Sequence, residues 1–242
     1  MARRPARKSA AKSARSSSAD RPARPAAPVG ERDKIVAAFL ALLAEKPFEQ
    51  IGFAEIAKAA GVSLTQLRGE FASTLAILAA HIKATDRAVL AEDLSDMAEE
   101  SPRERLFDVL MRRLEALAPY REAVRSLLRS ARRNPPLAVA LNGLAVRSQQ
   151  WMLTAAGISA AGPRGILRAQ GLAMLFGSVL GTWTHDEDPG QARTMAALDR
   201  ALARGQRWAG FLDDLCGVPS RICRLRSRRR RGDEETDEAA AA

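Results

Sequence analysis

Apolar residues recur at spacings of three and four along most of this 242-residue chain, and this spacing limits the possible folds more than any other feature. It places apolar side chains on one face of an α-helix, whereas a half-buried strand needs strict alternation. Aromatic residues make up only 5% of the chain, and β-branched residues are sparse, which argues against strands. The expected helices lie at about 33–46, 53–60, 63–71, 74–98, 102–118, 120–132, 137–155, 163–183 and 191–215. The sequence therefore predicts an all-α fold.

Prolines mark several of the expected helix ends. Lys46-Pro47 ends the first helix, because proline disfavours a helical conformation in the residue before it. Ser101 is a candidate N-cap for a helix that carries Pro102 in its first turn. We expect Asn134-Pro135-Pro136 to close one helix before the next begins at Leu137.

The formal net charge of +10 comes mainly from the two ends of the chain. Residues 1–30 hold eight basic and one acidic side chain, and residues 220–242 hold seven basic and five acidic. Neither segment has enough apolar residues to form a core, so we expect a disordered basic arm and a disordered charged tail. Between them we expect two domains, at 31–82 and 83–219. The arm could contact DNA phosphates without sequence preference, or it could simply be solvated.

Residue types that carry catalysis or bind metals are scarce. The chain has two cysteines, Cys216 and Cys223, and two histidines, His81 and His185, at spacings that do not suit a metal site. It shows no Ser-His-Asp set and no glycine-rich phosphate loop, so we expect neither an enzyme nor a bound cofactor or metal. The first thirty residues lack the apolar core of a signal peptide, and no apolar run could span a bilayer, which favours a cytoplasmic protein.

Residues 53–71, FAEIAKAAGVSLTQLRGEF, have the pattern of two short helices joined by a tight turn. Gly61 permits the turn, and Ser63 is well placed to cap the second helix. Leu67 and Phe71 lie four residues apart and are expected to face the core. The side chains left facing outward are Leu64, Thr65, Gln66 and Arg68. A helix-turn-helix presents its recognition helix to the DNA major groove in this way; a plain pair of helices in a bundle is the alternative.

The segment from Asp33 to about Ile82 resembles the DNA-binding domain of TetR-type transcriptional regulators. The matching features are a first helix that ends near Lys46-Pro47-Phe48, the run 53–62, Phe71, and Leu75-Ala76-Ile77-Leu78. The resemblance implies a three-helix helix-turn-helix domain followed by a larger helical domain that dimerises and binds a ligand. It also implies that the recognition helices of the dimer enter successive major grooves of operator DNA. The residues expected to contact the operator are Ser63, Leu64, Thr65, Gln66, Arg68 and Ser73.

Two residues depart from the pattern of that family. Its members usually carry aromatic residues, histidine or tyrosine just before the position of Phe71, and these side chains contact phosphates. Here the positions hold Gly69 and Glu70. Gly69 weakens the helix by about 1 kcal/mol relative to alanine, and Glu70 brings a negative charge towards the phosphates. Residues 31–85 hold six basic and six acidic side chains, so the first domain is neutral.

The second domain carries a more diffuse pattern. It consists of Arg113-Leu114-x-x-Leu117-x-Pro119-Tyr120, then Asn134-Pro135-Pro136, Trp151, Trp183-x-x-Asp186 and Thr194-x-x-x-Leu198. Over about residues 105–212 this pattern is similar to the lipid-binding accessory protein of ubiquinone biosynthesis, of the Coq series, which itself has a TetR-like fold. The similarity implies a hydrophobic tunnel that holds an isoprenoid or another lipid, without catalysis.

The expected helix 163–183 is apolar nearly all round, as is typical of a helix between a pocket and a partner subunit. Methionines would provide adaptable packing around an apolar ligand. The candidate ligand-binding residues are Met111, Leu114, Tyr120, Leu127, Trp151, Met174, Phe176 and Trp183. Such residues are also typical of an ordinary core, and Trp183, His185 and Asp186 of an ordinary helix end.

Two hypotheses for the function follow. The first is a homodimeric, DNA-binding transcriptional regulator of the repressor kind that responds to an apolar small molecule and dimerises through residues 164–184 and 191–213. The second is a TetR-fold lipid-binding accessory protein that does not bind DNA, in which the basic stretch 224–231 touches an anionic membrane surface. Gly69 and Glu70 favour the second hypothesis, whereas the turn at Gly61 favours the first.

Overall fold

The computed structural model describes residues 30–92, 97 and 99–205, and this part of the chain is all-helical. The helices are α1 (Glu31–Glu45), α2 (Phe53–Ala60), α3 (Leu64–Glu70), α4 (Thr74–Ala91), α5 (Pro102–Leu117), α6 (Arg121–Arg133), α7 (Pro135–Ala155) and α8 (Gly162–Trp183). Two 3-10 turns, η1 (Phe48–Gln50) and η3 (Ala118–Tyr120), lie between them, and residues 192–205 are also helical. The fold class expected from the spacing of apolar residues is confirmed.

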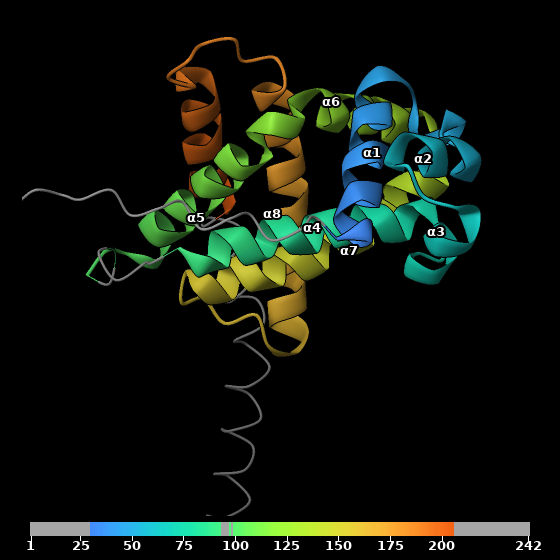
Figure 1. Ribbon diagram of the computed structural model, residues 1–242. Helices are drawn as coiled ribbons and strands as arrows, with labels where there is room; N and C mark the ends of the chain where they lie inside the picture. Colours follow the sequence, from blue (N-terminus) through green and yellow to red (C-terminus); the bar gives the residue numbers. More distant parts are fainter. Residues whose placement is uncertain (1–29, 93–96, 98, 206–242) are drawn as a thin grey trace, which may run out of the picture.

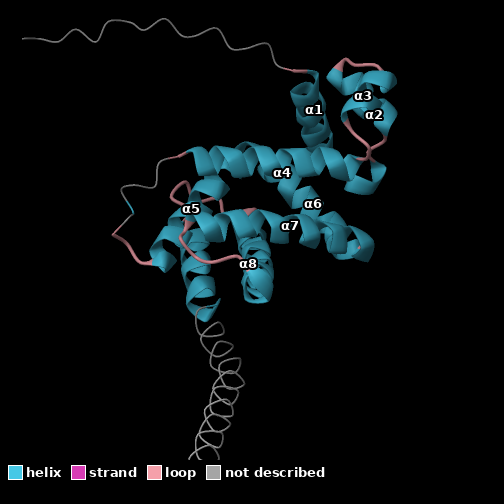
Figure 2. Cartoon of the chain, turned by 90° about the horizontal axis from the view of Figure 1, so that it is seen from below, coloured by secondary structure: helices cyan, strands magenta, loops and turns pink. Residues whose placement is uncertain are grey.

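The helices form two groups joined by long elements. Helices α1, α2 and α3 gather at one end, which we call the head, and α5, α8 and residues 192–205 lie towards the other end, in what we call the body (Figure 1). Helices α4 and α7 lie side by side and run from one end to the other (Figures 1 and 2). Helix α6 packs on both α1 and α7 and so contacts the head directly.

Each group has its own apolar core. The head core is built from α1 to α3 and the start of α4, with one residue, Ala123, contributed by α6. Its buried residues are Ile35, Phe39, Leu40, Leu43, Ile51, Ile56, Ala57, Leu67, Phe71, Ile77, Leu78 and Ala123. The body core joins the far end of α4 to α5, α7, α8 and residues 192–205, with Trp183 at 0% exposure among its members. Because α4 contributes to both cores, a shift of α4 in the body also moves the head.

A buried ion pair crosses the body. Arg113 of α5 pairs with Asp86 of α4, and the Ser148 hydroxyl of α7 donates to the same Oδ1 atom of Asp86 at 2.8 Å. Asp86, Arg113 and Ser148 are 7%, 5% and 2% exposed. A carboxylate in such a position is tolerated only when it is paired, so this network fixes the relative positions of α4, α5 and α7.

Most expected helix ends agree with the structure, with two differences. Helix α4 ends at Ala91 rather than near residue 98. Pro135 and Pro136 begin α7 instead of separating it from α6: Asn134 caps α7 by accepting the Leu137 amide at 3.0 Å. Proline fits the first turn of a helix because the N–H it lacks would have no partner there.

The predicted arm apart from residue 30, the charged tail, both cysteines and the expected helix beyond residue 205 lie outside the described residues. Among the helices that are described, none combines the length and apolar content needed to cross a bilayer.

Candidate functional site

The α2–α3 turn has the geometry that its sequence predicts. Gly61 adopts φ 66° and ψ 34°, a left-handed conformation that glycine enters without steric cost. The Ser63 hydroxyl accepts the Gln66 amide at 3.1 Å, and the Gln66 side chain accepts the Ser63 amide at 2.8 Å. This reciprocal capping box satisfies two amides at the start of α3 and fixes where that helix begins.

Helix α3 buries one face and exposes the other. Leu67 is 2% exposed, and Phe71, directly after the helix, is 4% exposed in the head core. The opposite face, which we call the α3 surface, consists of Ser63, Leu64, Thr65, Gln66 and Arg68, all of them exposed. Leu64 is 56% exposed. The sixth residue expected to contact DNA, Ser73, is half-buried and caps α4 by accepting the Ala76 amide at 3.1 Å.

The first turn of α1 is hydrogen-bonded to α3. The Gln66 side chain donates to Glu31 at 2.7 Å, and Arg32 donates to both the carbonyl and the carboxylate of Glu70, at 3.3 and 3.2 Å. The Arg32 guanidinium also stacks on the Phe71 ring, 4.4 Å from its centroid. Glu70 is therefore neutralised by Arg32, which sequence reasoning missed because the partners are 38 residues apart and no local pattern links them.

The candidate ligand-binding residues do not gather around one space. Leu114, Phe176 and Trp183 are buried in the body core, with Met111 packed against it. Tyr120 and Leu127 pack against the head core instead. Trp151 and Met174 are 59% and 69% exposed. None of these eight residues lines either of the two pockets described below, so their role in binding a ligand stays a prediction.

Four buried polar side chains of the body and its boundary with the head keep an unpaired atom: Nε2 of His81, Nε of Arg113, Oε1 of Gln149 and Nε1 of Trp183. The His81 ring meets Tyr120 edge to face, with centroids 4.7 Å apart. Burial, and then the nearby Arg113 charge, lower the pKa of His81 to about 4. Each unpaired buried group is costly, so these atoms are the natural polar contacts for a water or a ligand in the body.

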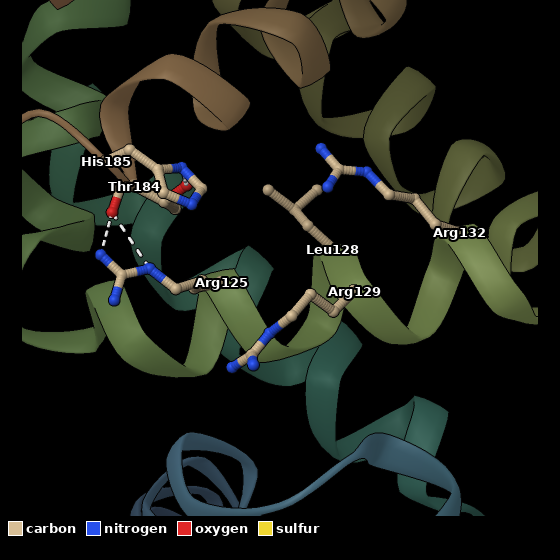
Figure 3. Close-up of a pocket in the computed structure, with 6 residues that line it drawn as sticks. All are labelled: Arg125, Leu128, Arg129, Arg132, Thr184 and His185. Atoms are coloured by element: carbon tan, nitrogen blue, oxygen red, sulfur yellow. Dashed lines mark hydrogen bonds between the residues drawn. The ribbon is translucent and has the colours of Figure 1, made fainter.

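One pocket lies between α6 and the C-terminal end of α8, and we call it the arginine pocket. It has a volume of about 170 Å³ and is lined by Arg125, Leu128, Arg129, Arg132, Thr184 and His185. Arg125 donates to the Thr184 carbonyl, at 3.1 Å from Nε (Figure 3). Arg132 and His185 lie on opposite sides of Leu128 in the same view. The other pocket lies over the α7–α8 connection and is lined by residues 154 and 157–161.

The chain beyond α8 forms an ordered helix end. Asp186 is 1% exposed and accepts the amide and the hydroxyl of Thr194 at 2.9 and 2.6 Å. The Thr194 hydroxyl, as the main cause, holds the pKa of Asp186 below its usual value. Arg121 donates to the Asp186 carbonyl at 2.6 Å, and its guanidinium lies 4.7 Å from the Trp183 ring. The interpretation of this segment as an ordinary helix end matches these contacts, and α6 supplies the cations that face the negative pole of α8.

Solved structures share this architecture. A TetR transcriptional regulator from Nitrosomonas europaea aligns with a TM-score of 0.57 at 23% sequence identity, over 73% of this chain and 98% of that one. A TetR regulator from a Rhodococcus species aligns with a TM-score of 0.53 at 22% identity, over 72% of this chain and 95% of that one. One from Streptomyces coelicolor aligns with a TM-score of 0.51 at 15% identity, over 78% of this chain and 85% of that one.

No protein-family model and no curated protein sequence matches the chain. The structural likeness therefore establishes the fold, which is that of the TetR-type transcriptional regulators. It gives no support to the expected similarity of the second half to the lipid-binding accessory protein of ubiquinone biosynthesis.

Proposed function

We propose that this protein is a DNA-binding transcriptional regulator of the TetR type, in which α3 enters the major groove. The observation that carries the proposal is the α3 surface. Thr65, Gln66 and Arg68 stand exposed on a helix whose start is capped and whose other face is buried. Arg68 has the donor geometry to bind guanine, and Leu64 can contact a thymine methyl group. The Gln66 amide, in contrast, is already held by Ser63 and Glu31. The contact of Arg32 with Glu70 places a positive charge beside the unfavourable negative one.

We further propose that the protein acts as a homodimer whose two recognition helices bind successive major grooves. Helix α8 supports this, because it exposes Ile166, Leu167 and Met174 to 55%, 50% and 69%. Leu167 and Met174 lie seven residues apart and so on one face of the helix, with Gly171 between them. A contiguous exposed apolar face of this kind is typical of a subunit interface.

The body is proposed to bind a largely apolar small molecule that changes the position of the head, most simply releasing a repressor from DNA. Support comes from the unpaired polar atoms of Arg113 and Gln149, which are 5% and 2% exposed within an otherwise apolar core. A pocket that opens between α5 and α7 would offer these atoms to a polar end of the ligand.

The experiment that tests the proposal is selection of genomic DNA fragments by the purified full-length chain, followed by sequencing. The matched variant is Arg68→Ala, with Arg147→Ala as the control, since Arg147 is exposed on α7 far along the chain from α3. We expect one recurrent, roughly palindromic motif with the wild type and the control, and its loss with Arg68→Ala.

Native mass spectrometry of the same preparation distinguishes this proposal from the alternative, a lipid-binding accessory protein that does not bind DNA. A co-purified lipid without any enriched DNA motif would contradict the proposal and indicate a lipid-binding accessory protein. A motif recovered equally well by the wild type and Arg68→Ala would contradict the assignment of α3 as the reading element.

A further inference from the structure

The arginine pocket contains cations that none of the described residues neutralises. Arg125 is engaged twice, by the Thr184 carbonyl and by Glu122, whose carboxylate lies 2.9 Å from Arg125 Nη1. Arg129 and Arg132, in contrast, have no hydrogen bond or ion pair with any residue that the structure describes. No carboxylate lines the pocket.

These residues share one side of α6 for a geometric reason. Positions 125, 129 and 132 are separated by four and three residues, so their side chains project from one face of the helix. Gly181 of α8 lies opposite, where a Cβ atom would make an ordinary van der Waals contact with Arg132 Nη2 at 3.9 Å. The result is a recess that combines two unpaired guanidinium groups, the exposed His185 ring and the apolar Leu128 side chain.

An adjoining face of α6 is bonded to the head. The Ser126 hydroxyl donates to the Lys46 carbonyl at 3.0 Å, and the Phe48 amide donates to the Ser130 hydroxyl at 3.1 Å. Both serines are about 5% exposed or less. Two serines, four residues apart, therefore tie α6 to the segment between α1 and α2, beside the arginine face.

From these observations we infer that the arginine pocket binds a small molecule through a carboxylate or phosphate group, and that α6 transmits its binding to the head. Guanidinium groups bind such oxyanions through paired, charge-assisted hydrogen bonds. A volume of about 170 Å³ admits a small anion with a short carbon skeleton, which Leu128 would contact. The inference goes beyond the proposed function, because this anion is distinct from the largely apolar ligand proposed for the body, and it rests on that function only for the consequence at DNA.

Calorimetric titration of the full-length chain with sodium pyrophosphate and with citrate tests the binding step, the first as a phosphate probe and the second as a carboxylate probe. We expect saturable binding of at least one probe, one per chain, and affinity reduced about tenfold or more in the variant Arg129→Gln/Arg132→Gln. Arg147→Gln is the matched control, because it removes an exposed arginine elsewhere. All three side chains are exposed, so the variants should fold.

Absence of saturable binding for both probes would overturn the inference, as would equal losses in the pocket variant and the control. The second outcome would mean that the probes bind non-specifically to the basic chain.

Hydrogen exchange measured by mass spectrometry tests the transmission step without DNA. With the bound probe, we expect slower exchange in peptides covering 121–133 and 46–51, which contain the Ser126 and Ser130 contacts. Protection of 121–133 alone would overturn transmission through α6. Because neither measurement involves DNA, these results remain interpretable if the chain proves not to bind DNA.

Discussion

His81 is held neutral by its surroundings, and this makes stability depend on pH. It is 7% exposed, and its folded-state pKa is lowered from 6.5 to about 4. Between pH 6.5 and about 4, His81 binds a proton in the unfolded chain but stays neutral in the folded chain. The free energy of unfolding therefore falls as the pH falls. The stability is fully present above pH 6.5, and about 3 kcal/mol should be lost by pH 4.

Chemical denaturation at several pH values between 7 and 4 measures this loss. His81→Phe, which keeps the ring against Tyr120 but cannot titrate, should flatten the profile in that window. A profile that is equally steep in His81→Phe would assign the effect to other groups.

Gly69 weakens α3 without any packing reason. A Cβ atom at this position would meet nothing within 4 Å, and its φ is not in the left-handed region. Gly69→Ala should therefore stabilise the protein by about 1 kcal/mol, seen as a higher denaturation midpoint. Gly61→Ala should have the opposite effect, because φ 66° is strained for alanine. A loss of stability in Gly69→Ala would contradict the open space around this position.

At the level of helices, the sequence correctly predicted those helix ends at which a single residue sets the backbone conformation. Gly61 and the capping serines, Ser63 and Ser101, act within their own turn, so their effect is visible in the sequence. The predicted start of α7 at Leu137 was wrong, because a proline can stop one helix or occupy the first turn of the next. The choice between these depends on packing.

The candidate site was predictable only in part. The α3 surface follows from the periodicity of one short helix. The bond from Arg32 to Glu70 and the arginine pocket join segments that are distant in sequence, so they depend on the tertiary structure. Arg129 and Arg132 offered one usable signal, which was their shared face on an arginine-rich helix.

The ion pair between Asp86 and Arg113 should couple α4 to α5 strongly. Arg113→Ala leaves a buried carboxylate unpaired and should cost about 3–5 kcal/mol of unfolding free energy in urea denaturation. The double variant Asp86→Leu/Arg113→Met removes both charges and should recover much of that loss. If the double variant lost as much unfolding free energy as its two substitutions lose separately and in sum, the two charges would not interact with each other.

For the whole molecule, the proposed dimerisation through α8 would set the spacing of the two recognition helices. Met174→Glu should raise the dimer Kd about 100-fold or more in sedimentation experiments, because a twofold interface buries the new charge twice. Val139→Glu is the control, since Val139 is 74% exposed on α7, outside the proposed interface. A dimer unaffected by Met174→Glu would exclude α8 as its interface.

The central claim is that α3 reads the DNA sequence. The most direct test measures binding of the protein to an enriched genomic fragment by fluorescence anisotropy. We predict that Arg68→Ala weakens binding to that fragment by about 1–3 kcal/mol. Binding to unrelated DNA of the same length should change little, and Arg147→Ala should alter neither affinity. Equal weakening on both DNAs would contradict sequence reading by α3, and no preference of the wild type for any fragment would contradict the claim as a whole.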